Sequence, residues 1–139
     1  MKLFIDSGPL VAHFNSDDFL HDQAERTFSA FASGRLDFKH FYISDYIFDE
    51  CVNVIGSRTK RFDLARILGD ALISSNVISI IHVDENLFLE SWKIFKRFEG
   101  SGLSFTDSSS IAIMEQWGID SIFSFDKHFQ MFGDFRILS

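Results

Sequence analysis

The chain has 139 residues, of which 46% are hydrophobic and 18 are phenylalanine, so it is long and apolar enough for one folded domain and is not a disordered chain. Its single cysteine, Cys51, excludes a disulfide framework and a cysteine-based zinc cluster. The sequence shows no long apolar span and no cleavable signal, which favours a cytoplasmic protein without a membrane segment. The net charge of −7 argues against non-specific coating of DNA, but it is compatible with an enzyme whose carboxylates hold metal ions.

The first half of the chain begins with a short apolar run that ends in an acid, Asp6, and this run predicts a buried strand. Ser7 is expected to cap the helix that follows, with Pro9 near its first turn. The elements predicted in this half are, in order, a strand at 2–6, helices at 7–14 and 17–34, an extended piece at 41–43, and helices at 44–55 and 62–73, with Ser44 as the cap of the helix at 44–55.

The second half contains the plainest strand, residues 77–83, which is nearly all apolar, as expected for a strand that is covered on both faces. Asp84 and Thr106 are the expected N-caps of its two helices. The elements predicted here are that strand, helices from Asp84 to about 99 and from Thr106 to 117, a strand at 121–125 and an edge strand at 135–138. Strands separated by helices predict an α/β fold with parallel pairing, and the helices between residues 6 and 77 suggest a helical hairpin over the sheet.

Two acids are predicted at the carboxyl ends of strands. Asp6 follows the first strand and Asp126 follows the strand at 121–125. In open α/β sheets, ligands bind in the crevice outside the carboxyl ends of the strands. If these two strands are neighbours, the two carboxylates meet at the same edge of the sheet.

Helical phase selects two further acids. On the helix that begins at Ser44, Glu50 falls at the border of the apolar arc, whereas Asp49 points away from it. On the helix that begins near Thr106, Asp107 lies in line with the apolar positions 111 and 114. An acid on a buried face of a first turn is unusual, although the helix dipole favours it there.

Each acid also has an ordinary interpretation: Asp6 as a strand-end cap, Glu50 as a surface residue, Asp107 as a partner of the helix dipole and Asp126 as a turn former. Taken together, those interpretations require four coincidences. Four clustered carboxylates repel one another and raise each other's pKa unless hard divalent cations compensate. Mg²⁺ and Mn²⁺ prefer oxygen ligands and support phosphodiester hydrolysis.

With these residues in place, the whole chain resembles the PIN-domain nucleases, and among them the VapC-type toxins of toxin–antitoxin pairs. The segment "FIDSGPLVAHF" is similar to the first motif of the family, and "YISDYIFDECVNVI" to the second. The segment "LSFTDSSSIAIMEQWGID" resembles the third motif and "IFSFDKHF" the fourth. The four acids of these motifs are all present and in order.

The resemblance implies a single PIN-like domain over residues 1–139, a three-layer α/β/α sandwich around a mainly parallel sheet. It implies Mg²⁺- or Mn²⁺-dependent cleavage of RNA, with the metals surrounded by Asp6, Glu50, Asp107 and Asp126, and with Asp6 and Asp107 as direct ligands. Hydroxyl groups that support this site are implied at Ser7, Thr106 and Ser124. A homodimer and a small VapB-like antitoxin are the implied protein partners.

Other interpretations remain open or fail on particular residues. A phosphotransferase of the haloacid-dehalogenase type needs a second acid two residues after the first, and Gly8 stands there. A non-catalytic PIN-like binding module would lack one or more of the acids. A housekeeping RNA-processing or DNA-repair nuclease of the same fold remains open, because substrate choice depends on surface and loops. His128, between Phe125 and Phe129, is expected to be structural.

Overall fold

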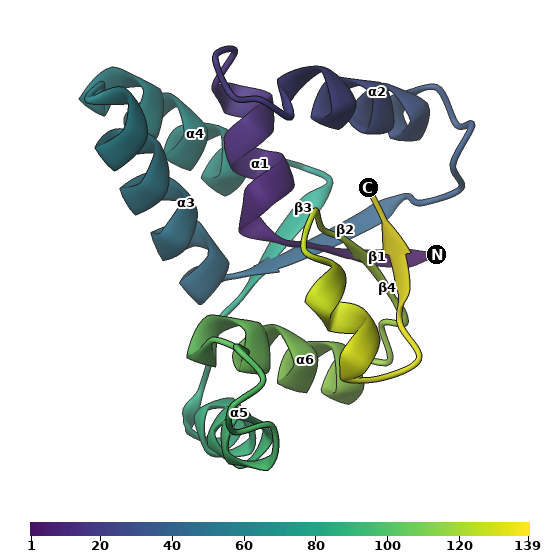
Figure 1. The fold of residues 1–139 in the computed structure, drawn as a ribbon. Coiled ribbons are helices and arrows are strands. Elements are labelled where there is room, and N and C mark those ends of the chain that lie inside the picture. The colour runs from purple at the N-terminus through teal and green to yellow at the C-terminus, as the bar shows by residue number, and fades with distance from the viewer.

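The computed structural model describes residues 1–139 and confirms the α/β class: five strands form one sheet with helices on both sides (Figure 1). The elements in chain order are β1 (Lys2–Ile5), α1 (Ser7–Phe14), α2 (His21–Ala32), β2 (His40–Ser44), α3 (Asp45–Thr59), α4 (Phe62–Ser74), β3 (Ile78–Ile81), α5 (Glu85–Arg97), α6 (Phe105–Trp117), β4 (Ser121–Phe123), the 3₁₀ helix η1 (Lys127–Met131) and β5 (Arg136–Leu138).

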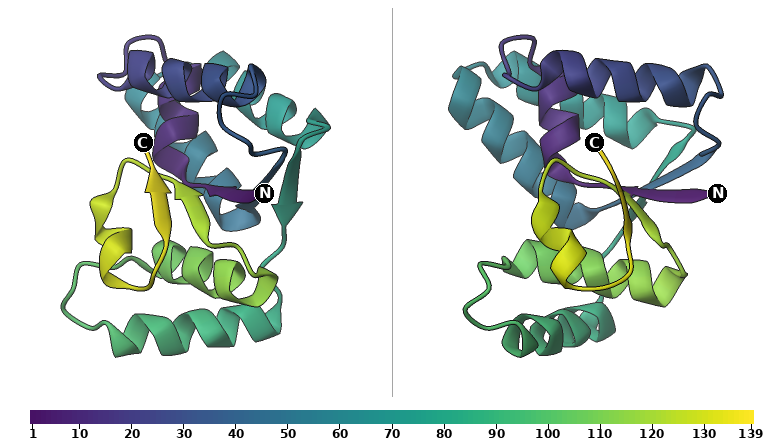
Figure 2. Two further views of the ribbon diagram at one scale, coloured as in Figure 1. Left: turned by 90° about the vertical axis from the view of Figure 1, so that its right-hand side faces the viewer. Right: turned by 45° about the vertical axis from the view of Figure 1, so that its right-hand side comes forward.

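The sheet is parallel throughout and has the strand order β3-β2-β1-β4-β5. The chain first moves from β1 outward through β2 to β3, and then returns to the other side of β1 for β4 and β5. Helices α1 to α4 lie on one side of the sheet, and α5 and α6 lie on the other (Figures 1 and 2). The order therefore reverses between β1 and β4, which is the switch point where open α/β sheets bind ligands.

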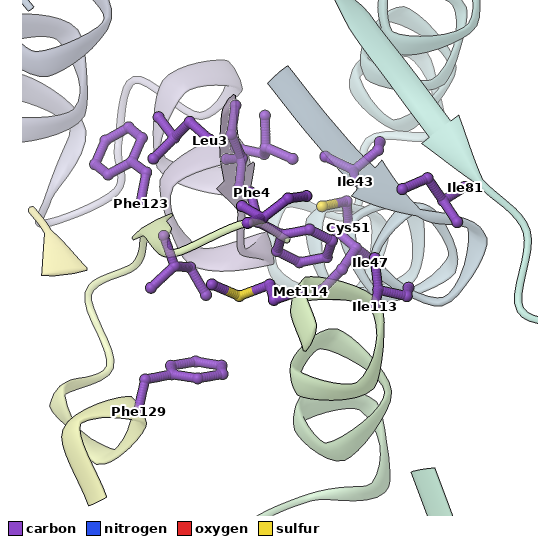
Figure 3. Packing of buried hydrophobic residues seen from close by; sticks show 14 of the residues in the cluster. Leu3, Phe4, Ile43, Ile47, Cys51, Ile81, Ile113, Met114, Phe123 and Phe129 are labelled. Carbon is purple, nitrogen blue, oxygen red and sulfur yellow. The ribbon is translucent and has the colours of Figure 1, made fainter. Parts of the chain in front are cut away.

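The central strand β1 is buried on both faces, because Leu3, Phe4 and Ile5 are almost completely shielded from solvent. Successive side chains of a strand point to opposite faces. Phe4 points towards Met114 and Ile113 of α6, while Leu3 points to the opposite side (Figure 3). The core is thus continuous through the sheet, and it holds the carboxyl end of β1 in a fixed position.

Most predicted elements are confirmed, and the helical hairpin is the packed pair α3 and α4. Ser44 and Asp84 cap α3 and α5 as expected, through side chains that accept from backbone N–H groups three residues later. The extended piece at 41–43 is a full strand, β2, paired to both β1 and β3.

Three expectations about where helices begin are wrong. Helix α2 begins at His21 and not at Asp17, because Asn15 and Asp18 side chains accept from backbone N–H groups two residues later and form turns. The N-cap of α1 is Asp6 and not Ser7. The N-cap of α6 is Ser104 and not Thr106.

The expectation that residues 77–83 form a strand covered on both faces is also wrong. Strand β3 is at the edge of the sheet, and it pairs only with β2. Val77 is 54% exposed, and Ile78 and Ile80 are only half-buried. An apolar run does not distinguish a covered central strand from an edge strand, because that depends on the strand order. No helix in the structure combines the length and apolar character needed to cross a membrane.

Candidate active site

Asp6 is the innermost residue of the candidate site. It follows β1 directly, and its backbone N–H donates to the carbonyl of Phe123 on the neighbouring strand β4. One carboxylate oxygen, Oδ1, accepts from the backbone N–H of Ser7 at 2.8 Å, and the other, Oδ2, accepts from Oγ of Ser124 at 2.7 Å. The start of α1 and the residue that follows β4 thus hold this carboxylate from both sides.

The environment of Asp6 opposes its ionisation. The residue is 8% exposed, and its pKa rises from 3.8 to about 6, mainly because burial removes the carboxylate from water. The hydrogen bonds from Ser124 and Ser7 lower the pKa, while the negative charges of Asp107 and Glu50 raise it. Asp6 is therefore a buried acid with other acids close by and no cation to neutralise it.

Glu50 reaches the same place from α3. Its Oε1 accepts a 2.5 Å hydrogen bond from Oγ of Ser7, so the first residue of α1 connects Asp6 to Glu50. Glu50 is half-buried, whereas Asp49 is exposed and accepts from Asn53 one turn later. The helical phase read from the sequence is confirmed for both acids.

Asp107 belongs to the first turn of α6, where it completes a capping box. Oγ of Ser104 accepts from the backbone N–H of Asp107, and Asp107 Oδ2 accepts from the backbone N–H of Ser104. Burial raises the pKa of Asp107, and the negative charges of Asp126 and Glu50 add to the increase. The capping box fixes this side chain at the helix end that faces the other acids.

Asp126 lies just beyond β4 and is held by local contacts. Its backbone N–H donates to Oγ of Ser124, and its Oδ1 accepts from the backbone N–H of His128 at 2.9 Å. The imidazole Nδ1 of His128 lies 2.7 Å from the same oxygen. His128 is exposed, so the expectation that it lies in a hydrophobic corner is wrong; its neighbour Phe129 is buried and Phe125 is half-buried.

These residues surround one open pocket of about 610 Å³ at the switch point between β1 and β4. Of the predicted site residues, the four acids and Ser7 line the pocket, Ser124 lies behind Asp6, and Thr106 is not part of the lining. Sequence reasoning did not select four lining residues, which are Gly8, Ser104, Phe125 and His128. Of these four, only Ser104 has a sequence pattern that predicts its role, because it stands three residues before an acid at the start of a helix, as in a capping box.

The side chains of the pocket suit a divalent cation that keeps several of its water ligands. They do not suit a cation whose ligands all come from the protein. No three His, Cys, Asp or Glu side chains are arranged to hold a metal ion. Each of the four carboxylates already accepts a hydrogen bond from the protein. Mg²⁺ retains several waters and commonly binds through one or two carboxylates, so an acidic, oxygen-lined pocket of this kind fits it.

Cys51 takes no part in this chemistry. It is completely buried on α3, and its Sγ lies 3.9 Å from the carbonyl oxygen of Ser7. Burial raises the pKa of the Cys51 thiol far above its usual range, and the charges of Asp6 and Glu50 raise it further. A thiol in this environment stays protonated and is not a nucleophile.

The chain is similar to known proteins in both sequence and fold. A family model described as "PIN domain" matches residues 3–134. The 23S rRNA-specific endonuclease VapC20 of Mycobacterium tuberculosis is 24% identical to the chain over 131 residues, which cover 94% of this chain and 94% of that protein.

Solved structures share the fold. The crystal structure of M. tuberculosis VapC20, a Sarcin-Ricin loop cleaving toxin, has a TM-score of 0.83 at 24% identity and covers 96% of this chain and 98% of that chain. The structure of VapBC2 from Rickettsia felis, bound to a DNA fragment from its promoter, has a TM-score of 0.71 at 14% identity and covers 99% of this chain and 98% of that chain.

Proposed function

Because the chain belongs to the PIN domain family, we propose that it is a metal-dependent endoribonuclease that hydrolyses RNA phosphodiester bonds. The observation that carries the proposal is the pocket at the switch point, where four separate segments of the chain each contribute one carboxylate. Neither lysine nor arginine lines this pocket, so no permanently charged base of the protein compensates its negative charge. A site that binds cations is the simplest use of such an arrangement.

The proposed ion is Mg²⁺ or Mn²⁺, with Asp6 and Asp107 as direct ligands and Glu50 and Asp126 around them. When bound, such an ion supplies a nucleophilic water and stabilises negative charge on the phosphate oxygens. The hard oxygen donors of the pocket and the two raised carboxylate pKa values are consistent with this assignment.

The residues around the carboxylates would hold them in position. Ser124 and the backbone of Ser7 fix both oxygens of Asp6, so its lone pairs keep one orientation towards the pocket. The Ser7 hydroxyl orients Glu50 in the same way. Thr106, which the family resemblance selects as a further supporting hydroxyl, stays a prediction at this stage.

We also propose that the chain is the toxin of a toxin–antitoxin pair with a small VapB-like antitoxin as its partner. Support comes from the relative named as a 23S rRNA-specific endonuclease and from the fold shared with VapBC2, a complex that was solved on promoter DNA. Structured ribosomal RNA is accordingly the first substrate to test.

The test is cleavage of single-stranded and structured RNA by the purified protein in Mg²⁺, in Mn²⁺ or in EDTA. Glu50→Gln removes one pocket charge, and Asp49→Asn is its matched control, because it neutralises the adjacent acid that points into solvent. We expect cleavage to require the metal and to fall at least a hundredfold in Glu50→Gln, with the control unchanged. Cleavage in EDTA, or equal losses in both variants, would contradict the proposal.

A further inference from the structure

A second cavity, of about 480 Å³, lies between α2 and the sheet, on the face of β1 that is turned away from α6. It shares no lining residue with the acidic pocket. Eight of its nine lining residues are hydrophobic and the ninth is a lysine: Ile5, Phe28, Phe31, Ala32, Phe38, Lys39, Phe41, Val77 and Ile78. A largely apolar cavity of this volume, with one polar group in its wall, is typical of a small-molecule site.

The packing of the helices explains why the cavity is present. Helix α2 packs against α1, and α4 packs against α3, but no residue of α1, α3 or α4 lines the cavity. The connection from α2 to β2, residues 33–39, passes around its edge (Figure 1). The starts of β2 and β3 thus have an apolar face that only α2 approaches, and Val77, just before β3, remains 54% exposed.

The aromatic rings of the wall hold one another in place. Phe31 is at the centre of this group: its ring centroid lies 6.1 Å from that of Phe28 and 5.9 Å from that of Phe38. The ring of Phe41 is 5.3 Å from that of Phe31. Because each ring is fixed by its neighbours, the wall is ordered before a ligand binds, and binding costs less entropy.

Lys39 is the only charged residue in the lining. It is exposed and forms no ion pair within the protein. Asp37, two residues earlier, is also exposed, but it does not line the cavity. A lysine ammonium is a compact charge on a flexible stem, so it can meet a negative group at the cavity mouth. Its charge complements a ligand with an apolar body and one anionic head.

We propose that this cavity binds a free medium-chain fatty carboxylate, with the alkyl chain among the phenylalanine rings and the carboxylate on Nζ of Lys39. Each methylene group that leaves water for the apolar wall contributes favourably to binding. A neutral or cationic amphiphile would leave the lysine without a partner. A phospholipid fits less well, because it brings two chains and a bulky head group to one cavity of about 480 Å³. This binding site is separate from the nuclease chemistry and does not depend on it.

The test is calorimetric titration of the full chain with sodium decanoate and with decyltrimethylammonium bromide, both below their micelle concentrations. Lys39→Glu reverses the charge at the cavity, and Lys60→Glu is its matched control at an exposed lysine that ends α3. Ala32→Trp places an indole in the cavity without removing a buried side chain. Its control is Ser29→Trp, at an exposed position of α2 outside the lining. Circular dichroism verifies that each protein stays folded with and without ligand.

We expect one decanoate to bind per chain, at least fivefold more tightly than the cationic amphiphile. Lys39→Glu should weaken decanoate binding at least fivefold, because attraction becomes repulsion, and Ala32→Trp should abolish it. Both controls should keep the affinity of the wild type.

Three results would overturn the proposal. The first is the absence of saturable decanoate binding, or an affinity that Ala32→Trp does not change. The second is equal affinity for the two amphiphiles, or binding that Lys39→Glu does not weaken, because the cavity would then not select the head group. The third is that neither amphiphile binds while Ala32→Trp lowers the mass of the protein in light scattering, which would mean that another copy of the chain covers the cavity. Because binding is the readout, the result is independent of nuclease activity.

Discussion

Replacement of Asp6 by asparagine removes the buried charge while it keeps the shape of the side chain. In Asp6→Asn, the amide oxygen can accept from the backbone N–H of Ser7, and the NH₂ group can donate to Oγ of Ser124. The hydrogen-bonded frame of the pocket is therefore retained. The variant thus isolates the cost of the charge in the metal-free protein.

The magnitude follows from the shift in pKa. The pKa of Asp6 is about 6 in the folded protein, against 3.8 for an unperturbed aspartate, a difference of about 2.2. At 1.36 kcal/mol for each pKa unit, the ionised carboxylate costs the folded state about 3 kcal/mol at neutral pH. Between these two pKa values the folded state binds more protons than the unfolded state, so the free energy of unfolding falls as pH rises through this window.

The assay is urea unfolding of wild type and Asp6→Asn in EDTA, followed by circular dichroism at pH 4, 5, 6 and 7. We expect the two proteins to be about equally stable near pH 4, with the variant gaining about 3 kcal/mol by pH 7. Millimolar Mg²⁺ should stabilise the wild type and not the variant, because only the wild type offers the Asp6 carboxylate to the ion. Asp49→Asn is the matched control, because it makes the same substitution at an exposed acid outside the pocket.

The refuting result is a variant that is less stable than the wild type at pH 7, or a difference between the two proteins that does not change with pH. Either outcome would mean that the hydrogen bonds from Ser7 and Ser124 stabilise the ionised form at least as much as burial destabilises it. The pocket would then hold its negative charge without needing a cation.

Three further predictions concern the surroundings of the pocket. Ser124→Ala removes a buried donor to Asp6 and should lower the free energy of unfolding at pH 7 by about 1–3 kcal/mol in urea titrations. Ser104→Ala should cost about 1 kcal/mol by loss of the α6 cap, whereas Thr106→Ala, at the position first expected to be the cap, should cost less in the same measurement. The Cys51 thiol should react with a thiol reagent at pH 8 only at the rate of unfolding, because burial raises its pKa; rapid labelling of the folded protein would contradict this.

Local sequence signals were sufficient for most of the fold. Apolar runs that end in polar residues identified β1 and β4, and Ser44 and Asp84 marked the starts of α3 and α5. Those features depend on residues within a few positions of one another, so the sequence contains them directly. The errors occurred where several polar residues competed for one role, as at the start of α6, where Ser104 rather than Thr106 forms the capping box.

The four acids illustrate the same division at the pocket. The sequence alone determined that Asp6 ends a buried strand, that Glu50 borders an apolar arc while Asp49 does not, and that Asp107 opens a helix. Only the tertiary structure decided that β1 and β4 are neighbours, that β3 is an edge strand and that His128 is exposed beside Asp126. The physical reason is that periodicity and capping act over a few residues. Strand order, by contrast, depends on segments that are far apart in the chain. The raised pKa of Asp6 depends on burial in the folded protein, and its neighbours Asp107 and Ser124 are more than a hundred positions away in the sequence.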